Sequence, residues 1–216
     1  MSHKFLPSFV QRKGRITKSQ EKNLLSLPDY EISTYSEIQK AKNSFEKVIL
    51  EIGFGNGENV FKFANNNREN LYIGSEVYMA GIGQLLGDVI SNNLNNIRVV
   101  TGDIRLLLDD VKEPIFDHVV IICPDPWPKL KHHKRRMLNN DFLDLIHKTI
   151  KDNGHLFMST DCENYAESIE EAINQNEGFA KLEDSIYKEA GLTKFQKRAV
   201  IEGRKIYPFP LKKLAK

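Results

Sequence analysis

Five acidic residues stand at the ends of the strands of a predicted parallel sheet. Glu51 falls late in the first strand, and the next four strands are followed by Glu76, Asp103, Asp125 and Asp161. Ligands of open parallel sheets bind outside the carboxyl ends of the strands. A single carboxylate at a strand end is usually structural, for example a helix cap. Five of them predict a binding edge for a ligand that is cationic or donates hydrogen bonds.

A glycine-rich turn follows the first predicted strand, in the string Glu51-Ile-Gly53-Phe-Gly55-Asn-Gly57. Glycine permits a tight turn and a close approach of the backbone to a ligand. The spacing departs from the dinucleotide pattern G-x-G-x-x-G, because the third glycine falls two positions after the second. Glu76 lies 23 residues after Gly53, near the ~20 expected for an acid that binds a ribose diol. The pair predicts an adenosine-containing cofactor; the alternative is a glycine turn with an unrelated surface glutamate.

The surroundings of this turn indicate which adenosine compound binds. The turn carries no cluster of Lys or Arg that would hold phosphates, so a dinucleotide fits it poorly. S-adenosylmethionine has no phosphate and carries a sulfonium cation, which suits acidic surroundings. Asp103, in the string Thr101-Gly102-Asp103, is placed to accept from the adenine amino group. The alternative for Asp103 is an N-cap of the segment that follows.

The most distinctive string is Cys123-Pro-Asp-Pro-Trp-Pro-Lys129. Three prolines in five residues make a rigid turn, which fixes Asp125 and Trp127 in place. A carboxylate beside an indole suits a heterocycle, because the ring can stack on Trp127 while Asp125 accepts an amino or imino hydrogen. The alternative is a proline-rich structural turn with a core tryptophan.

Basic residues gather in three segments of a chain whose net charge is only +2. Residues 1–22 carry +5, residues 129–136 carry +5 and residues 194–216 carry +7, so the rest of the chain carries −15. Basic surface attracts phosphates and steers nucleic acid, although any one run alone is more often a solvated face. The run that follows the tryptophan turn is expected to hold the backbone of the bound nucleotide. Its His132 and His133 lack the spaced Cys or His partners of a metal site, so no metal is expected.

Short β-branched runs alternate with amphipathic stretches from about residue 47, which is the pattern of βαβ units. The predicted strands are Val48–Ile52, Leu71–Ser75, Ile97–Thr101, His118–Cys123 and His155–Thr160. The predicted helices lie near Glu58–Asn65, Ala80–Ser91, Asn140–Ile150 and Asn164–Gln175. Right-handed crossovers would wind these elements into one open α/β sheet with helices on both faces.

The two ends of the chain read differently from its centre. Residues 1–40 are interpreted as a basic extension, with a helical stretch between Pro7 and Pro28, and residues 41–216 as one domain. Pro208 and Pro210 are taken to mark an irregular C-terminal segment.

Length and composition exclude several classes of protein. The 216 residues, 40% hydrophobic and 28% charged, are typical of one globular domain with a sizeable core. Two cysteines allow no disulfide framework and favour a reducing compartment. The longest aliphatic run, Val119 to Cys123, is far shorter than the ~20 residues of a membrane span, and the N-terminus lacks the apolar core of a secretory signal. We therefore expect a cytoplasmic protein without membrane contact.

Taken together, the motifs resemble the bacterial tRNA (guanine-N(7)-)-methyltransferases, a family of the Rossmann-like class I methyltransferases. The resemblance covers nearly the whole chain, and the Pro-Asp-Pro-Trp string followed by basic residues is its most specific part. It rests on the strings Phe9-Val-Gln-Arg-Lys-Gly-Arg-Ile-Thr17, Glu51-Ile-Gly-Phe-Gly-Asn-Gly57, Pro124-Asp-Pro-Trp-Pro-Lys129, Lys134-Arg-Arg136, Ser159-Thr-Asp161 and Thr193-Lys-Phe-Gln196.

The resemblance implies a doubly wound, mostly parallel, seven-stranded sheet and methyl transfer from S-adenosylmethionine to nitrogen 7 of the variable-loop guanosine, tRNA position forty-six. Asp125 is then the catalytic residue, and the cofactor-side residues are Glu51, Gly53, Gly55, Gly57, Glu76, Asp103 and Asp125. The substrate-binding residues are Lys129, Asp161, Thr193, Lys194, Phe195 and Gln196. The RNA-binding residues are Lys131, His132, His133, Lys134, Arg135 and Arg136. The family motif ordinarily ends in Glu where this chain has Gln196, which puts that role in question.

Two other functions stay open at this stage. One is an amino-group RNA methyltransferase, because acid-proline-aromatic turns after a fourth strand also serve that chemistry. The other is a basic RNA-binding protein with a vestigial cofactor pocket. In every case tRNA or another RNA is the expected partner, and the chain is expected to act as a monomer or a homodimer.

Overall fold

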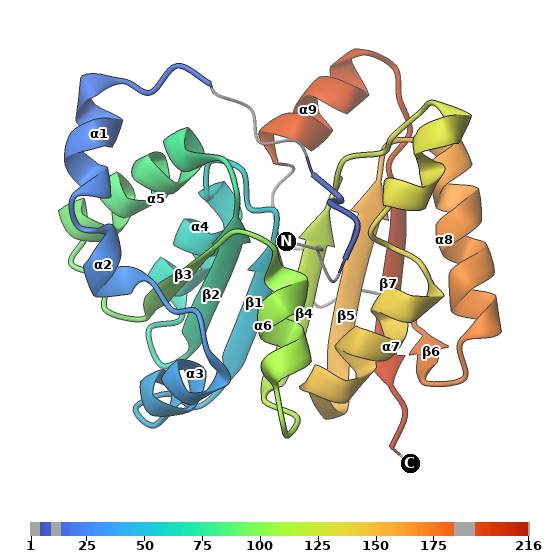
Figure 1. The fold of residues 1–216 in the computed structure, drawn as a ribbon, viewed down its shortest axis with the longest axis horizontal. Coiled ribbons are helices and arrows are strands. Elements are labelled where there is room, and N and C mark those ends of the chain that lie inside the picture. Colours follow the sequence, from blue (N-terminus) through green and yellow to red (C-terminus); the bar gives the residue numbers. More distant parts are fainter. Residues whose placement is uncertain (1–4, 10–13, 184–192, 216) are drawn as a thin grey trace. The chain divides into compact units, whose positions relative to one another are not determined.

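The computed structural model describes residues 5–9, 14–183 and 193–215, and Figure 1 shows its fold. The chain divides into two compact units. The N-terminal unit is Gln11–Lys112, and the C-terminal unit is Glu113–Lys216 together with Met1–Val10. The described residues contain seven strands, the number that the family resemblance implies.

The N-terminal unit is built on three parallel strands, β1 (Val48–Ile52), β2 (Leu71–Glu76) and β3 (Ile97–Thr101), in the order β3-β2-β1. All five residues of β1 are buried, as expected for a parallel strand covered on both faces. The connecting helices α4 (Glu58–Asn66) and α5 (Met79–Ser91) pack against each other and against β2. A further helix, α6 (Ile104–Asp110), follows β3.

Three helices precede the sheet in this unit: α1 (Lys18–Leu24), α2 (Leu27–Tyr30) and α3 (Tyr35–Lys42). Capping boxes at Thr17 and Thr34 satisfy the first backbone N–H groups of α1 and α3. Helix α1 packs on α5, where the Asn23 side chain donates to the Gly83 carbonyl at 2.9 Å. The described part of residues 14–42 is therefore packed onto the N-terminal unit.

The C-terminal unit contains β4 (Phe116–Ile122), β5 (Ile150–Thr160), β6 (Phe179–Lys181) and β7 (Tyr207–Lys213), in the order β4-β5-β7-β6. Strands β4 and β5 are parallel, whereas β7 runs antiparallel to β5 and β6. The helices are α7 (Asn140–Thr149), α8 (Glu163–Gln175) and α9 (Lys194–Ile201), and the 3-10 helix η1 covers Leu130–Arg135. Helix α8 packs on α7 and β5.

The expectation of an irregular C-terminal segment at Pro208 and Pro210 is wrong, because both lie inside β7. The carbonyl of Pro210 accepts from the backbone N–H of Leu182, on the β6 side, so Pro210 and Pro208, two residues apart, direct their backbone groups away from β5. Strand β6 pairs only with Leu211–Lys213. The two missing N–H groups therefore interrupt no hydrogen bond between β7 and β5. Prolines are tolerated in strands at positions of this kind, where the sheet needs no backbone N–H donor.

Two further findings concern the described residues as a whole. No helix in residues 5–9, 14–183 or 193–215 is long and apolar enough to cross a membrane. In the same part of the chain, no group of three or more His, Cys, Asp or Glu residues is arranged to hold a metal ion.

Candidate functional site

Glu51 is a buried acid near the end of β1. The strand register places it beside Gly74 of β2, and it is only 7% exposed. Burial, together with the charge of Glu76, raises the pKa of Glu51 to about 8. At neutral pH this carboxyl therefore holds a proton unless a cation is placed next to it.

The glycines in and around the turn after β1 have two roles: some allow close packing, and others leave open space beside the backbone. A Cβ at Gly57 would lie 2.8 Å from Leu85, and a Cβ at Gly81 would lie 1.9 Å from the Gly55 carbonyl oxygen, so these glycines let α5 pack against the turn. At Gly53, and at Gly102 after β3, a Cβ would meet no described atom within 4 Å. Both have φ angles in the left-handed region, 74° and 91°. Their backbone therefore borders open space that a ligand could fill.

Glu76, at the end of β2, ties the glycine turn to its own strand. Its carboxylate accepts from the backbone N–H groups of Gly55 at 2.7 Å, Val77 at 2.7 Å and Tyr78 at 3.0 Å. These bonds to the charged form fix the orientation of the carboxylate at the strand end.

Asp103 caps helix α6. Its carboxylate accepts from the backbone N–H of Arg105 at 3.1 Å and pairs with the Arg105 guanidinium at 2.6 Å. The structure thus shows the capping role that the sequence left open for Asp103, and contact with adenine stays a prediction.

The residues of the N-terminal unit fit S-adenosylmethionine. A protonated acid, Glu51, ionises most easily beside a cation, and Glu76 presents a fixed carboxylate for hydroxyl groups. Gly53 and Gly102 leave space next to the backbone. The structure therefore brings together Glu51, Gly53, Gly55, Gly57 and Glu76, with Asp103 capping the helix after β3.

In the C-terminal unit, the proline turn holds Asp125 exposed between two residues with positive φ, Cys123 at 47° and Trp127 at 45°. Trp127 is half-buried and so is not a core residue, and its indole N–H donates to the Ser8 carbonyl at 2.9 Å. The Arg135 guanidinium lies 4.2 Å from the indole centroid, a cation–π contact. The turn is therefore built by residues far apart in sequence.

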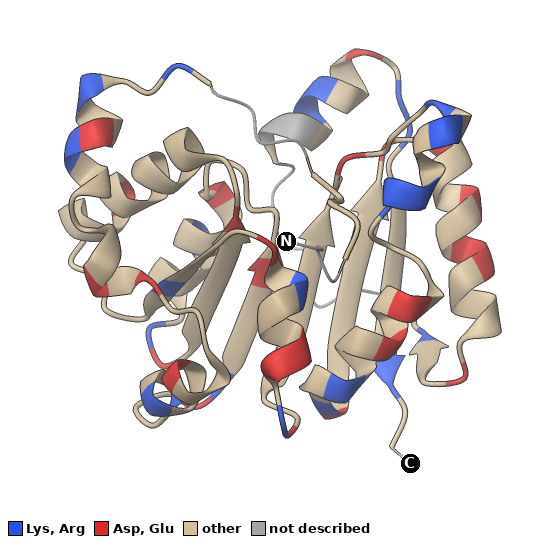
Figure 2. Ribbon diagram, in the orientation of Figure 1, with Lys and Arg blue, Asp and Glu red and all other residues tan. Residues whose placement is uncertain are grey.

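The basic run forms η1, and Figure 2 marks its Lys and Arg positions in blue. Its cations differ in exposure. Lys129, Lys131 and Lys134 are exposed. Arg135 donates its Nε to the Pro7 carbonyl at 3.2 Å. Desolvation, followed by neighbouring cations, lowers the pKa of His132. His133 is half-buried.

Arg136 differs from the other residues predicted to bind RNA. It is only 7% exposed, and its guanidinium donates to groups within the C-terminal unit. Arg136 is therefore a buried cation with internal partners, and its predicted contact with RNA stays a prediction.

Asp161 and the start of α9 make internal contacts as well. Asp161 pairs with Arg204, whose other terminal nitrogen lies 2.6 Å from Glu202. Thr193 and Gln196 form a capping box: the Gln196 N–H donates to the Thr193 hydroxyl at 3.2 Å, and the Thr193 N–H donates to the Gln196 side chain at 3.0 Å. The predicted side-chain roles of Lys194 and Phe195 fall outside the described residues.

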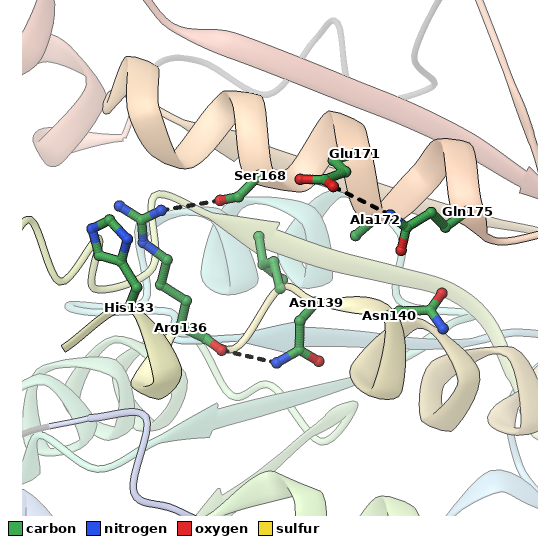
Figure 3. Close-up of a pocket in the computed structure, with 9 residues that line it drawn as sticks. His133, Arg136, Asn139, Asn140, Ser168, Glu171, Ala172 and Gln175 are labelled. Atoms are coloured by element: carbon green, nitrogen blue, oxygen red, sulfur yellow. Dashed lines mark hydrogen bonds between the residues drawn. The ribbon is translucent and has the colours of Figure 1, made fainter. Parts of the chain in front are cut away.

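A pocket of about 340 Å³ lies in the C-terminal unit between α8 and the segment from η1 to α7. Figure 3 shows the residues that line it, of which the polar ones are His133, Arg136, Asn139, Asn140, Ser168, Glu171 and Gln175. Several of these are paired with each other: Gln175 donates to Glu171 at 3.3 Å, and Arg136 donates to Ser168 at 3.1 Å. The pocket contains none of the strand-end acids, so it is separate from the predicted cofactor site.

Sequence reasoning missed the internal role of Arg136 and the Arg204 partner of Asp161. The second pair is 43 residues apart in the chain, and no local pattern signals it. The capping box of Thr193 and Gln196 did have a signal, because Ser or Thr followed three residues later by Glu or Gln marks a helix start.

Comparisons with known proteins agree on one family. A family model described as "Putative methyltransferase" matches residues 45–209. The tRNA (guanine-N(7)-)-methyltransferase of Nitrosococcus oceani is 38% identical over 214 residues, covering 96% of this chain and 91% of that protein. The protein of the same name from Wolbachia pipientis wMel is 38% identical over 181 residues, covering 83% of this chain and 81% of that protein.

Solved structures show the same fold at low identity. A 16S rRNA methyltransferase, KamB, has a TM-score of 0.62 at 13% identity, covering 85% of this chain and 95% of that one. An antibiotic-related methyltransferase has a TM-score of 0.58 at 21% identity, covering 85% of this chain and 96% of that one. The predicted Rossmann-like class I methyltransferase fold is confirmed.

Proposed function

The chain belongs to the tRNA (guanine-N(7)-)-methyltransferase family, and on this premise we propose that it methylates ring nitrogen 7 of the variable-loop guanosine of tRNA, position forty-six. The observation that carries the proposal is the identity to curated family members over nearly the whole chain. The acidic site at Glu51 and Glu76 and the exposed cations of η1 support it, because they suit a cationic cofactor and a polyanionic substrate.

S-adenosylmethionine supplies the methyl group, carried on a sulfonium. On the protein side, Glu51 gives up its proton and provides a negative charge at the end of β1. Glu76, held by three backbone N–H groups, accepts from ribose hydroxyls. The open backbone at Gly53 and Gly102 admits the adenosine, and the predicted acceptor for the adenine amino group is Asp103.

Recognition of guanine falls to carboxylates of the C-terminal unit. Asp125 and Asp161 accept from the imino and amino groups of the Watson–Crick edge, and adenine lacks that pair of donors. Once a bound base covers these acceptors, one that is left without its donor costs ~1–3 kcal/mol. Asp125 is also proposed as the catalytic residue and as part of the cofactor-side set, because its negative charge favours the cation that develops on the purine.

No strong base is needed, because nitrogen 7 of guanine already presents a lone pair. Positioning therefore dominates, and holding the reacting atoms in line at ~3 Å can contribute ~7–11 kcal/mol. The rigid proline turn and the capped start of α9 are suited to this positioning.

Binding of the tRNA backbone is assigned to the exposed cations of η1 and the flanking Lys129, with Arg135 and the two histidines beside them. The residues at the start of α9, Thr193 to Gln196, are proposed to bind the substrate. Residues 1–40 are proposed as a basic extension of the domain formed by 41–216. A cytoplasmic location and a monomeric or homodimeric state complete the proposal.

The test is transfer of labelled methyl from S-adenosylmethionine to tRNA, followed by nucleoside analysis and borohydride–aniline cleavage, which is specific for 7-methylguanosine. We expect cleavage at a single variable-loop position. Label on adenine would favour the amino-group alternative. If calorimetry detects no binding of S-adenosylmethionine, an RNA-binding protein with a vestigial pocket would be favoured instead.

A further inference from the structure

The turn that carries Asp125 begins and ends on backbone that residues other than glycine rarely adopt. Cys123 and Trp127 both have φ in the left-handed region. Such conformations persist where surrounding contacts fix them, and they gather at functional sites. Cys123 is fixed because its backbone N–H donates to the Ser159 carbonyl of β5 at 2.9 Å.

Arg136 fixes the other end of the turn. Its Nε donates to the Pro126 carbonyl at 3.0 Å, and that carbonyl belongs to the peptide that leads directly into Trp127. Asp125 is the residue before Pro126. A hydrogen bond to the Pro126 carbonyl therefore restrains the Pro126–Trp127 peptide, which begins one residue after the proposed catalytic Asp125.

The same guanidinium is anchored on α8. Its terminal nitrogens donate to the Asn164 side-chain oxygen at 2.9 Å, the Ser168 hydroxyl at 3.1 Å and the Asn164 carbonyl at 3.3 Å. It also lies 4.8 Å from the ring centroid of Tyr165, a fully buried residue of α8. Figure 3 shows Arg136 pointing at Ser168 across the pocket. One side chain thus connects the turn to a packed helix.

Only an arginine can make this set of bonds. The planar fork offers five N–H donors in fixed directions, whereas a lysine offers one compact ammonium. With four bonds made inside the protein, and with 7% of its surface exposed, Arg136 has little left for a phosphate. Lys134, two residues earlier, is exposed and makes the natural comparison.

We propose that Arg136 is a positioning residue for methyl transfer, which holds Asp125 by tying Pro126 to Asn164 and Ser168 of α8, and that it does not bind RNA. This inference rests on the proposed function, in which Asp125 touches guanine. It separates Arg136 from the surface cations of the same basic run.

The test compares full-length Arg136→Lys and Asn164→Ala with Lys134→Ala as the matched control. Measurements are kcat, KM for tRNA, tRNA affinity at several salt concentrations and the fluorescence of Trp127, the chain's single tryptophan. We expect Arg136→Lys to lower kcat at least tenfold and to shift Trp127 emission, with tRNA affinity and its salt slope within twofold of wild type. Lys134→Ala should do the reverse: it should weaken tRNA affinity and flatten its salt slope, and leave the Trp127 emission unchanged.

Asn164→Ala removes a partner on α8 without touching the turn, so it keeps the test decisive if Arg136→Lys does not fold. We expect Asn164→Ala to lower kcat by about threefold or more, but by less than Arg136→Lys does. The double variant should have the kcat of Arg136→Lys alone, because both changes break the same connection. A weaker tRNA affinity with normal kcat in Arg136→Lys, or normal kcat and emission in Asn164→Ala, would overturn the proposal. If the wild-type protein fails to methylate tRNA, the proposed function is wrong. The Trp127 emission of the variants then still tests whether Arg136 connects the turn to α8.

Discussion

The indole nitrogen of Trp127 donates a hydrogen bond of 2.9 Å to the carbonyl oxygen of Ser8, 119 residues earlier in the chain. The neighbouring Pro7 carbonyl accepts from Arg135, whose guanidinium also lies over the indole ring. The N-terminal segment is therefore part of the turn that the sequence singled out, and it satisfies the polar end of a side chain proposed to contact a base.

Removal of residues 1–9 tests this relationship. Without the Ser8 and Pro7 carbonyls, the indole N–H and the Arg135 Nε lose their partners, so we expect a red shift of Trp127 emission and a rise of about threefold or more in KM for tRNA. A double replacement of Ser2 and His3 by Ala, which leaves residues 5–9 in place, is the control. Unchanged emission in the truncated protein would show that Ser8 does not hold the ring.

Glu51 should make cofactor binding depend on pH. Its pKa is raised to about 8, so in the protein without cofactor the Glu51 carboxyl is protonated below that pH. The carboxyl must lose this proton before it can carry a negative charge beside a cation. The dissociation constant for S-adenosylmethionine should therefore rise by up to about tenfold per pH unit below pH 8 and level off above it. Because the ligand also titrates, the comparison is with Glu51→Gln, measured by calorimetry. Identical pH profiles for the two proteins would contradict this role.

The same residue should affect stability in a predictable direction. The unfolded chain releases the Glu51 proton near the ordinary pKa of 4.5, whereas the folded protein keeps it until about 8. The free energy of unfolding therefore falls as pH rises across this window, by up to ~1.4 kcal/mol per unit. Glu51→Gln removes this loss, so thermal unfolding should show the variant gaining on wild type from pH 5 to pH 8. A constant difference in Tm would mean that the folded pKa is not raised.

The parts of the fold that sequence predicted well are those fixed by local burial. Strands β1 and β3 have the predicted bounds, because their apolar runs are buried on both faces and are flanked by turn residues. Strand β7 was not predicted, because two prolines in a segment argue against a strand. They are compatible with one only when their missing N–H groups face the side that has no hydrogen bonds to a neighbouring strand. That side is set by register, which is a tertiary property.

The site divides in the same way. The acids at the strand ends could be placed from the order of strands alone. The roles of Arg136 and Arg204 depend on which distant carbonyl or carboxylate faces them, so their sequence context, a basic run in each case, pointed only to RNA. The Thr193 and Gln196 pair was interpreted through the family motif, although its spacing is also that of a capping box.

The capping box explains how Gln196 can stand where the family has Glu. Either side chain accepts from the Thr193 N–H, so Gln196→Glu should change the free energy of unfolding by less than about 0.5 kcal/mol, whereas Thr193→Ala should lower it by ~0.5–2 kcal/mol. Chemical denaturation measures both. If Gln196→Glu raises turnover without changing stability, the charge at this position acts on the substrate in addition to the helix.

The exposed lysines of η1 should govern the salt dependence of tRNA binding. Lys131→Ala with Lys134→Ala removes two cations that we assign to phosphates, so the slope of log affinity against log salt should become shallower by about 1.5. Lys62→Ala with Lys112→Ala, in the N-terminal unit, removes the same charge elsewhere. Equal effects of the two double variants would mean that overall charge, and not η1, sets the attraction.

Asp125 is the residue on which the proposed chemistry depends most, and its replacement by Asn keeps the size of the side chain while removing the negative charge. Because Asp125 is exposed at the tip of a turn that other residues hold, we expect Asp125→Asn to fold normally and to bind tRNA within about twofold of wild type. Its kcat should fall by about 10²–10³, the usual cost of losing one electrostatic group at a reacting centre. Asp141→Asn, an exposed acid in the first turn of α7, is the matched control and should keep normal turnover. Single-turnover transfer of labelled methyl measures the step directly, and a rate in Asp125→Asn equal to that of the control would remove this carboxylate from the mechanism.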